Sequence, residues 1–400
     1  MSNNKYPPIA IGDECPMMNE ELNQERNLHI VAFDVPFPPN YGGVIDVFYK
    51  LKALKNAGVK IHLHCFKYGR DEAAILNEFC EEVTYYPRKT GFLSALMKRP
   101  YIVQSRRSPE LLANLCKDNY PILFEGLHSC FYINHQFLKG RRKIYRESNI
   151  EHHYYFHLFK GEKNIFKKSY FISASFKLLL YQKILKHATM MLVVSKTDTE
   201  YLQKHFKTSR VIYLPSFHPN DAFSVLPGRG DYALYHGKLS VTENFQAAEF
   251  LIKKVFAGSN NQLIVAGLEP PVNLQNLIKL HPNVKLIANP DDETMFGFIQ
   301  NAQANVLVTF QETGLKLKLL NTLFKGRFCL VNPAMVVGTG LESLCEIADG
   351  ADGLKNKLDE IMKRDFDVSE VNRRHEILSV NYSNTTNARR LINLIFGETD

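Results

Sequence analysis

The segment TGLKLKLLNTLFKG, residues 313–326, places two lysines at the start of an otherwise apolar helical pattern. Lys316 and Lys318 follow Gly314 closely, and leucines surround them. The N-terminus of a helix favours anions, because its unpaired amide groups carry partial positive charge. Lysines at this end of a helix are unfavourable when no anion is bound there, but they become favourable when a dianion is bound. The pattern therefore predicts a clamp for a diphosphate; the alternative is that both lysines extend into solvent with only their stems buried.

Two other positions have residues suited to anion binding. Gly42 and Gly43 open a helical pattern after the proline-containing loop that follows the apolar run 28–33. A glycine pair there lets backbone amides approach an anion, although it also suits a tight turn. Lys238 follows the apolar run 232–237, where it either meets an anion or is a solvated surface lysine. Neither signal is specific alone.

Polar side chains follow two more apolar runs, 121–125 and 143–147. Glu125 and His128 lie at the end of the first, where we expect a general base or a contact to a sugar hydroxyl. Arg146, Asn149 and Glu151 lie at the end of the second, in acceptor-binding or structural roles. Because parallel strands end at the same edge of a sheet, these groups should gather there.

Metal-binding patterns are weak in this sequence. His153 and His157 are four residues apart, but no complete ligand set with zinc-type spacing accompanies them, so we predict no metal. The seven cysteines form no C-x-x-C pair, and their odd number argues against a disulfide framework. These features favour a reducing compartment.

The apolar runs that position these residues alternate with helical patterns, which predicts an α/β fold with parallel, doubly wound sheets. The predicted strands are 28–33, 59–66, 82–86, 121–125, 143–147, 190–194, 210–214, 232–237, 262–267, 284–289, 305–310 and 327–331. A Pro- and Gly-rich stretch interrupts the pattern and predicts a linker. The expected parts are an N-terminal tail (1–27), a first domain (28–215), the linker (216–231), a second domain (232–365) and C-terminal helices (366–400) that could return to the first domain.

Positive charge is concentrated in one segment. Residues 139–187 contain twelve Lys or Arg and three Glu, a net charge of +9 against +8 for the whole chain. This favours an anionic partner such as phosphates, nucleic acid or a lipid surface, or else a solvated helix face. The N-terminus lacks the features of a signal peptide, and no apolar run reaches 18 residues. We expect a cytoplasmic protein, peripheral on the inner face of the membrane through residues 139–187.

Five motifs in this order resemble those of GT-B-fold glycosyltransferases of the family-4 type, also called glycosyl transferases group 1. They are PPNYGG, EGLHS, RESNIEHHYY, HGKLSVTEN and TGLKLKLLNTLFKGRFCLV, and the resemblance covers roughly residues 28 to 350. It implies two Rossmann-like domains facing a central cleft. It also implies a hexosyltransferase-type enzyme that moves a sugar from a nucleotide-diphospho sugar to a glycan, lipid-linked or other anionic acceptor. Such transfer is usually retaining and needs no metal or other cofactor.

The resemblance also implies roles for individual residues. His128 would lie near the reacting sugar, with Glu125 beside it. The donor would be bound by Gly42, Gly43, Lys238, Asn244, Glu312, Thr313, Gly314, Lys316, Lys318 and Asn321. Asn321 departs from the family pattern, because it replaces a glutamate that usually accepts hydrogen bonds from the ribose hydroxyls. Further departures are Thr313 at an upstream glutamate position, Glu243 at a basic position and Ser148 at a histidine position.

Three other functions compete with transfer. A non-catalytic binding or scaffold protein of the same fold is favoured by Asn321 and the altered carboxylates. A nucleotide-sugar epimerase would need carboxylates flanking the sugar, and the predicted cleft is poor in them. Nucleic-acid binding is suggested only by charge; tryptophan is absent and no RRM, KH or helix-turn-helix signature is present, so we predict no nucleic-acid partner.

Overall fold

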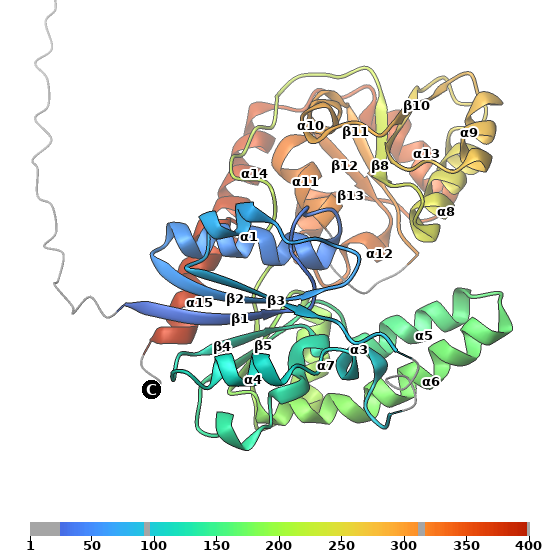
Figure 1. Cartoon of the computed structure of the whole chain (residues 1–400). Helices are drawn as coiled ribbons and strands as arrows, with labels where there is room; N and C mark the ends of the chain where they lie inside the picture. Colours follow the sequence, from blue (N-terminus) through green and yellow to red (C-terminus); the bar gives the residue numbers. More distant parts are fainter. Residues whose placement is uncertain (1–24, 92–96, 311–316, 398–400) are drawn as a thin grey trace, which may run out of the picture.

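The computed structural model describes residues 25–91, 97–310 and 317–397 (Figure 1). Two parallel sheets form the framework. The first has seven strands in the order β3-β2-β1-β4-β5-β6-β7, and the second has six in the order β10-β9-β8-β11-β12-β13. All strand pairs within both sheets are parallel, which confirms the predicted α/β class with two doubly wound sheets.

The first sheet and its helices occupy the N-terminal half of the described chain. Its strands are β1 (Arg26–Ala32), β2 (Val59–Lys67), β3 (Glu82–Pro87), β4 (Ile122–Glu125), β5 (Lys143–Glu147), β6 (Met190–Val193) and β7 (Arg210–Tyr213). Its helices are α1 (Gly42–Asn56), α3 (Tyr101–Gln104), α4 (Pro109–Leu115), α5 (Glu151–Gly161), α6 (Ile165–Tyr181) and α7 (Lys196–His205), with short 3-10 turns η1 (Ala74–Glu78), η2 (Leu127–Tyr132), η3 (Gln136–Leu138) and η4 (Gln182–His187).

The second sheet follows in the C-terminal half. Its strands are β8 (Ala233–Lys238), β9 (Leu263–Leu268), β10 (Val284–Ala288), β11 (Ala304–Leu307), β12 (Phe328–Val331) and β13 (Glu346–Ile347). The helices are α8 (Thr242–Phe250), α9 (Val272–Lys279), α10 (Asp292–Asn301), α11 (Leu317–Lys325), α12 (Pro333–Val336), α13 (Gly350–Ile361), α14 (Val368–Asn381) and α15 (Asn384–Phe396), with a π turn η5 (Leu251–Val255) and a 3-10 turn η6 (Glu342–Leu344). Each of the twelve predicted strands overlaps an observed one; β13, two residues long, was not predicted.

The central strands are apolar on both faces because helices cover both sides of each sheet. Ile30 of β1 belongs to the buried cluster that includes Leu51 of α1. Its neighbour Val31 points to the other face and belongs to a cluster with Leu111 of α4. Alternate strand residues thus fill two separate cores, as the two-residue period of a strand requires.

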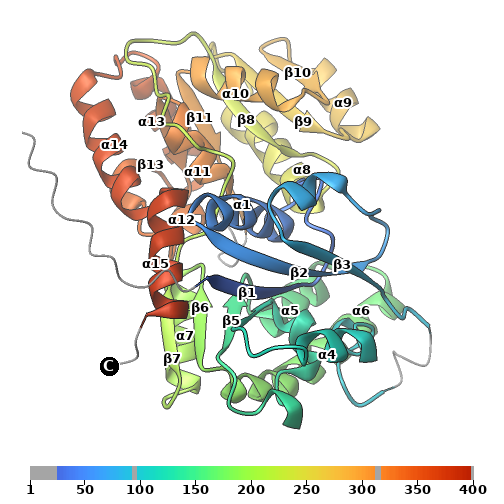
Figure 2. The ribbon, with the colours of Figure 1, turned by 60° about the vertical axis from the view of Figure 1, so that its left-hand side comes forward.

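The C-terminal helix α15 lies against the first sheet rather than the second (Figure 2). Leu391 and Ile395 are buried in the same cluster as Leu51 and Leu54 of α1. These two α15 residues are four apart and share a helix face, so two successive turns of α15 pack in the cluster that contains α1. The sequence left this return open, and the chain therefore crosses between the sheets twice, through residues 214–231 and through α14–α15.

Candidate functional site

Each sheet has one place where strands adjacent in space are distant in sequence. In the first sheet β1 lies beside β4, and in the second β8 lies beside β11. We call each of these two places the switch point of its sheet. The loops after two such strands leave in opposite directions, and the crevice at their carboxyl ends is the usual ligand site of an open α/β sheet. The predicted site residues follow these four strands, and β5.

The switch point of the first sheet brings glycine and aromatic groups together. A Cβ atom on Gly43 would lie 2.6 Å from Cζ of Phe33, so a larger residue at this helix start would require the Phe33 ring to shift. The ring of His128 lies 5.2 Å from the ring of Phe33, between centroids. Gly126 adopts φ +69, and a Cβ there would lie 3.2 Å from Nδ1 of His128. Phe33, which the sequence did not single out, is thus the residue around which the predicted His128 and Gly43 are arranged.

His128 and Glu151 are the predicted polar side chains near this switch point. Nδ1 of His128 lies 3.7 Å from Oε1 of Glu151 and has no hydrogen-bond partner among the described residues. Burial lowers the pKa of His128 well below its usual value, helped by the nearby Arg106 cation. Burial raises the pKa of Glu151 to about 8, with Arg106 opposing the shift. Both side chains are therefore uncharged near pH 7, and the Glu151 carboxyl group carries a proton that it can donate.

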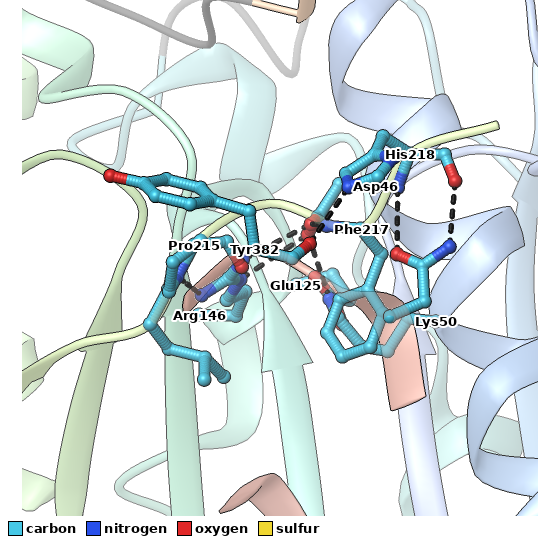
Figure 3. A network of polar contacts seen from close by, with 10 residues as sticks. Asp46, Lys50, Glu125, Arg146, Pro215, Phe217, His218 and Tyr382 are labelled. Atoms are coloured by element: carbon cyan, nitrogen blue, oxygen red, sulfur yellow. Dashed lines mark hydrogen bonds and ion pairs between the residues drawn. The ribbon is translucent and has the colours of Figure 1, made fainter. Parts of the chain in front are cut away.

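Glu125 and Arg146 lie instead in a buried network of ion pairs (Figure 3). Nζ of Lys50 is 2.7 Å from Oε1 of Glu125 and 2.8 Å from Oδ2 of Asp46. Nη2 of Arg146 is 3.1 Å from Oδ1 of Asp46. Burial acts to raise the pKa of Asp46, but the Arg146 and Lys50 cations lower it below the usual range. Because every member is buried, this geometry favours a structural role for Glu125 and Arg146.

The same network holds the chain segment that leaves the first sheet. Arg146 donates hydrogen bonds of 2.7 Å and 3.0 Å to the carbonyl oxygens of Leu214 and Pro215. The amide of Phe217 donates a 2.7 Å hydrogen bond to Asp46. Arg146 and Asp46 thus fix where the connection to the second sheet begins. Sequence reasoning missed Asp46; the signal was its position with Lys50, four residues apart on the apolar face of a helix.

Asn149 lies beside another buried carboxyl group. Its amide donates a 3.1 Å hydrogen bond to Oε1 of Glu147, and the hydroxyl of Tyr145 donates one of 2.6 Å to Oε2. Burial raises the pKa of Glu147 well above its usual value. The half-buried side chain of Asn149 therefore sits between β5 and α5, next to Glu151.

The switch point of the second sheet brings together three predicted donor residues from two motifs. Nζ of Lys318 donates a 2.6 Å hydrogen bond to Oδ1 of Asn244 and lies 5.3 Å from the ring centroid of Tyr235. Nδ2 of Asn244 donates a 2.9 Å hydrogen bond to the carbonyl of Lys238. A Cβ on Gly237 would lie 3.2 Å from Nζ of Lys318, so glycine keeps the strand end open beside the ammonium group. Lys318 is half-buried and does not extend freely into solvent.

Lys238 has an exposed partner. Its Nζ lies 3.0 Å from Oε1 of Glu269, and the two side chains are 39% and 61% exposed. Ser240 donates a 2.8 Å hydrogen bond to the other carboxylate oxygen. An exposed ion pair of this kind is weak, so Lys238 can exchange Glu269 for a phosphate oxygen at little cost.

Asn321 is engaged by the linker. Nδ2 of Asn220 donates a 2.9 Å hydrogen bond to Oδ1 of Asn321. Asn220 is itself buried, and its amide donates to Nδ1 of His218 at 3.2 Å. Asn321 therefore joins α11 to the segment between the sheets, a contact that the sequence did not predict.

The remaining predicted donor residues, Glu312, Thr313, Gly314 and Lys316, lie outside the described residues. Within the ranges that the structure describes, no three His, Cys, Asp or Glu side chains gather closely enough to hold a metal ion. None of the described helices is long and apolar enough to cross a membrane.

The candidate site residues at the switch point of the first sheet and those at the switch point of the second approach each other at the interface between the sheets. Ile45, in the first turn of α1, packs into the apolar cluster that contains Leu317 and Leu320 of α11. The glycine loop before α1 and the Lys318 end of α11 thus meet at one interface.

This arrangement matches a set of solved structures over almost the whole chain. WaaG, a glycosyltransferase involved in lipopolysaccharide biosynthesis, aligns with a TM-score of 0.64 at 12% identity, covering 93% of this chain and 100% of that one. HepE of Anabaena, solved with UDP and glucose, gives 0.62 at 11% identity over 93% and 99%. The sucrose-phosphate synthase of Thermosynechococcus elongatus gives 0.59 at 15% identity over 93% and 95%.

The chain has the GT-B fold. The predicted fold class is therefore confirmed, since the two parallel sheets with their helices match these GT-B structures. No protein-family profile matches the sequence. One curated relative, an uncharacterized 44.6 kDa protein in the cps region of Klebsiella pneumoniae, is 26% identical over 336 residues, covering 78% of this chain and 84% of the relative.

The candidate site residues come from both halves of the GT-B fold. Lys318, Asn244 and Lys238 lie on α11, α8 and β8 at the second sheet. His128, Glu151 and Gly43 lie on η2, α5 and α1 at the first sheet. The fold therefore brings cationic and hydrogen-bonding groups from one sheet to neutral polar groups from the other. Such a site can bind an anionic group on one side and an uncharged, hydroxyl-rich group on the other.

Proposed function

We propose that this GT-B protein transfers a sugar from a nucleoside-diphospho sugar to a hydroxyl group of a glycan or lipid-linked acceptor, with retention at the anomeric carbon and without a metal. The observation that carries the proposal is the contact of Lys318 with Asn244 at the switch point of the second sheet. It places a half-buried cation beside the start of α11, where a diphosphate would gain from both the ammonium group and the helix amides.

The main contribution of the protein to this reaction would be to stabilise the leaving group. When the bond between the anomeric carbon and the donor phosphate breaks, negative charge develops on the departing nucleoside diphosphate. Lys318 and Lys238, together with the N-terminus of α11, stabilise that charge. Preorganised cations of this kind can take the place of a divalent metal ion.

The acceptor hydroxyl loses its proton as it attacks the anomeric carbon. In the proposed reaction, an oxygen of the leaving phosphate accepts that proton, and the new C–O bond forms on the face from which the phosphate leaves. His128 and Glu151 are neutral near pH 7, because burial shifts both pKa values toward the uncharged forms. They hold the sugar through hydrogen bonds without placing a second charge beside the diphosphate.

The comparisons support this chemistry in general terms. HepE of Anabaena was solved with UDP and glucose, and WaaG is named as a lipopolysaccharide glycosyltransferase. The Klebsiella pneumoniae relative is named for the cps region. These names favour a nucleotide-sugar donor and a role in polysaccharide biosynthesis.

The proposal is tested by incubating the purified protein with a panel of UDP- and GDP-sugars and following release of UDP or GDP, with and without candidate glycan acceptors. We expect release with one donor, insensitive to EDTA and lost in Lys318→Ala. Release that requires a divalent metal, or that persists unchanged in Lys318→Ala, would refute the mechanism.

A second candidate function is non-catalytic binding of a nucleotide sugar. The hydrogen bond between Asn220 and Asn321 favours it, because the position that usually contacts the donor ribose is here tied to the linker. Saturable binding of UDP or GDP in calorimetry, with no turnover of any donor, would support this candidate over transfer.

A further inference from the structure

The helical hairpin formed by α5 and α6, residues 151–181, exposes an unusual amount of apolar surface. Nine of the twenty-two large apolar side chains that are exposed in the described part of the chain lie between residues 154 and 180. Near the hairpin turn, Ile165 is 72% exposed and Phe166 is 84% exposed; further along α6, Phe176 is 62% exposed. Figure 1 shows α5 and α6 extending together away from the first sheet. A concentration of this kind marks an interaction surface.

The exposed residues follow the period of a helix. Ile165, Ile172, Phe176 and Leu179 are separated by seven, four and three residues, so they lie along one face of α6. Leu178, by contrast, is buried in the core of the first sheet. The helix therefore has one apolar stripe that packs inward and a second that faces away from the body.

The exposed charge on the hairpin is mostly positive. Residues 151–181 contain five lysines, no arginine and two acidic residues, Glu162 and the buried Glu151. Nζ of Lys160 lies 4.8 Å from the ring centroid of Phe156, and Nζ of Lys168 lies 5.1 Å from that of Phe159. Lysines that lay their stems along apolar surface while the ammonium group stays in water are suited to the boundary between acyl chains and headgroups.

We propose that the α5–α6 hairpin docks the protein on an anionic lipid bilayer. The apolar stripe would enter the boundary region, and the lysines would contact anionic headgroups. A protein partner fits less well, because protein interfaces are depleted in lysine and enriched in arginine. No described helix can span a bilayer, so the hairpin lies on the surface.

The hairpin also begins at the candidate site. Glu151, the first residue of α5, lies 3.7 Å from His128, and α5 is 11 residues long, or about 16 Å. Docking the hairpin would therefore hold the site close to the membrane surface. A lipid-linked acceptor, which rests on the proposed transfer function, would then reach His128 without leaving the bilayer; the docking surface itself does not depend on that function.

Vesicle flotation tests the docking surface. The full chain is mixed with vesicles of phosphatidylcholine alone or of equal parts phosphatidylcholine and phosphatidylglycerol. We expect flotation only with the anionic vesicles, weakening as salt is raised. The double variant Ile165→Ser with Phe166→Ser should bind roughly tenfold more weakly or worse. Lys163→Gln with Lys167→Gln should weaken binding and flatten the salt dependence.

A matched control uses two equally exposed apolar residues on the second sheet's side. Val272→Ser with Leu280→Ser should leave flotation unchanged, because these side chains, 69% and 76% exposed, lie outside the hairpin. Circular dichroism and UDP or GDP binding, measured on every variant, separate loss of docking from unfolding and from failure of the donor site.

Three outcomes would overturn the proposal. One is absence of flotation with either vesicle, and another is equal flotation with neutral and anionic vesicles. The third is a lipid-free dimer in sedimentation that Phe176→Ser converts to monomer, because the stripe would then be covered by a second copy of the chain.

Discussion

Nζ of Lys318 donates a 2.6 Å hydrogen bond to Oδ1 of Asn244, although the two residues are 74 positions apart in the chain. The contact joins the start of α11 to the start of α8 across the switch point between β8 and β11. Asn244 neutralises none of the lysine's charge, since an amide oxygen is only a dipole. Asn244 therefore orients the ammonium group of Lys318 without neutralising its charge.

Replacing Lys318 with alanine should weaken binding of UDP or GDP by roughly tenfold or more, because a hydrogen bond from a charged group is worth about 1.5–3 kcal/mol. Binding of uridine or guanosine should change little, since these lack the diphosphate. Isothermal titration measures both. Lys325→Ala, at the other end of α11, is the control; equal losses for nucleotide and nucleoside would remove Lys318 from the clamp.

Replacing Glu151 with glutamine should stabilise the protein at pH 7.5 and much less at pH 5. Burial raises the pKa of Glu151 to about 8, so the native carboxyl stays protonated where the unfolded one is ionised. The stability that this group provides is complete below its unfolded pKa of about 4.3 and is lost as pH rises toward 8. Thermal unfolding at the two pH values measures the difference. A gain that is equal at both pH values would contradict the raised pKa.

Replacing Asp46 with alanine should destabilise the fold by about 3–5 kcal/mol, because Arg146 and Lys50 would be left as buried cations without their shared partner. Guanidinium unfolding measures the loss. Asp221→Ala removes an exposed ion pair with Lys52 instead and should cost under about 1 kcal/mol. Similar costs for the two variants would show that the buried network contributes little.

Acid should destabilise the protein through two buried histidines. Nδ1 of His29 is 2.9 Å from Nε2 of His64, whose Nδ1 is 2.9 Å from the hydroxyl of Tyr86. Burial lowers both histidine pKa values, so protons bind more readily to the unfolded chain. Stability should be complete above about pH 6.5 and fall below it. His64→Gln should reduce that slope in denaturant titrations between pH 7 and 5; an unchanged slope would rule out His64 as a contributor.

Replacing Asn321 with glutamate tests the altered ribose contact. A carboxylate accepts stronger hydrogen bonds than an amide, and Asn220 could still donate to it. Affinity for UDP or GDP should rise several-fold or more, while 2′,3′-dideoxy analogues should show no gain because they lack the hydroxyl groups. Asn321→Gln is the neutral control. A gain that is equal for both ligand types would place the carboxylate away from the ribose.

The order and positions of the strands were predictable because each is a short apolar run bounded by turn residues. Periodicity of this kind depends only on which side chains must leave water. Strand β13 was missed because two residues carry no period. The place of Lys318 at a strand-to-helix junction of the second sheet was also predictable, since it follows an apolar run that ends in turn residues; its role in binding an anion stays a prediction.

The roles of Glu125 and Arg146 depended on tertiary structure. In the sequence both are polar residues at strand ends, like His128 and Glu151. Only the fold shows that Glu125 and Arg146 meet Lys50 and Asp46 inside the protein, whereas His128 keeps an unpartnered Nδ1 among the described residues. Strand-end position predicts the edge of the sheet that a side chain reaches, but not the group that approaches it from another element.

The sequence by itself determined the two parallel sheets and the edge of each where chemistry can occur, because hydrophobic period and strand ends are local properties of the chain. Tertiary structure decided which polar groups are left for a ligand. Asn321 is tied to Asn220, and Lys318 is oriented by Asn244, through contacts that form only when segments 74 to 101 residues apart are brought together. Pairing of buried polar groups is a non-local condition, and no spacing in the sequence encodes it directly.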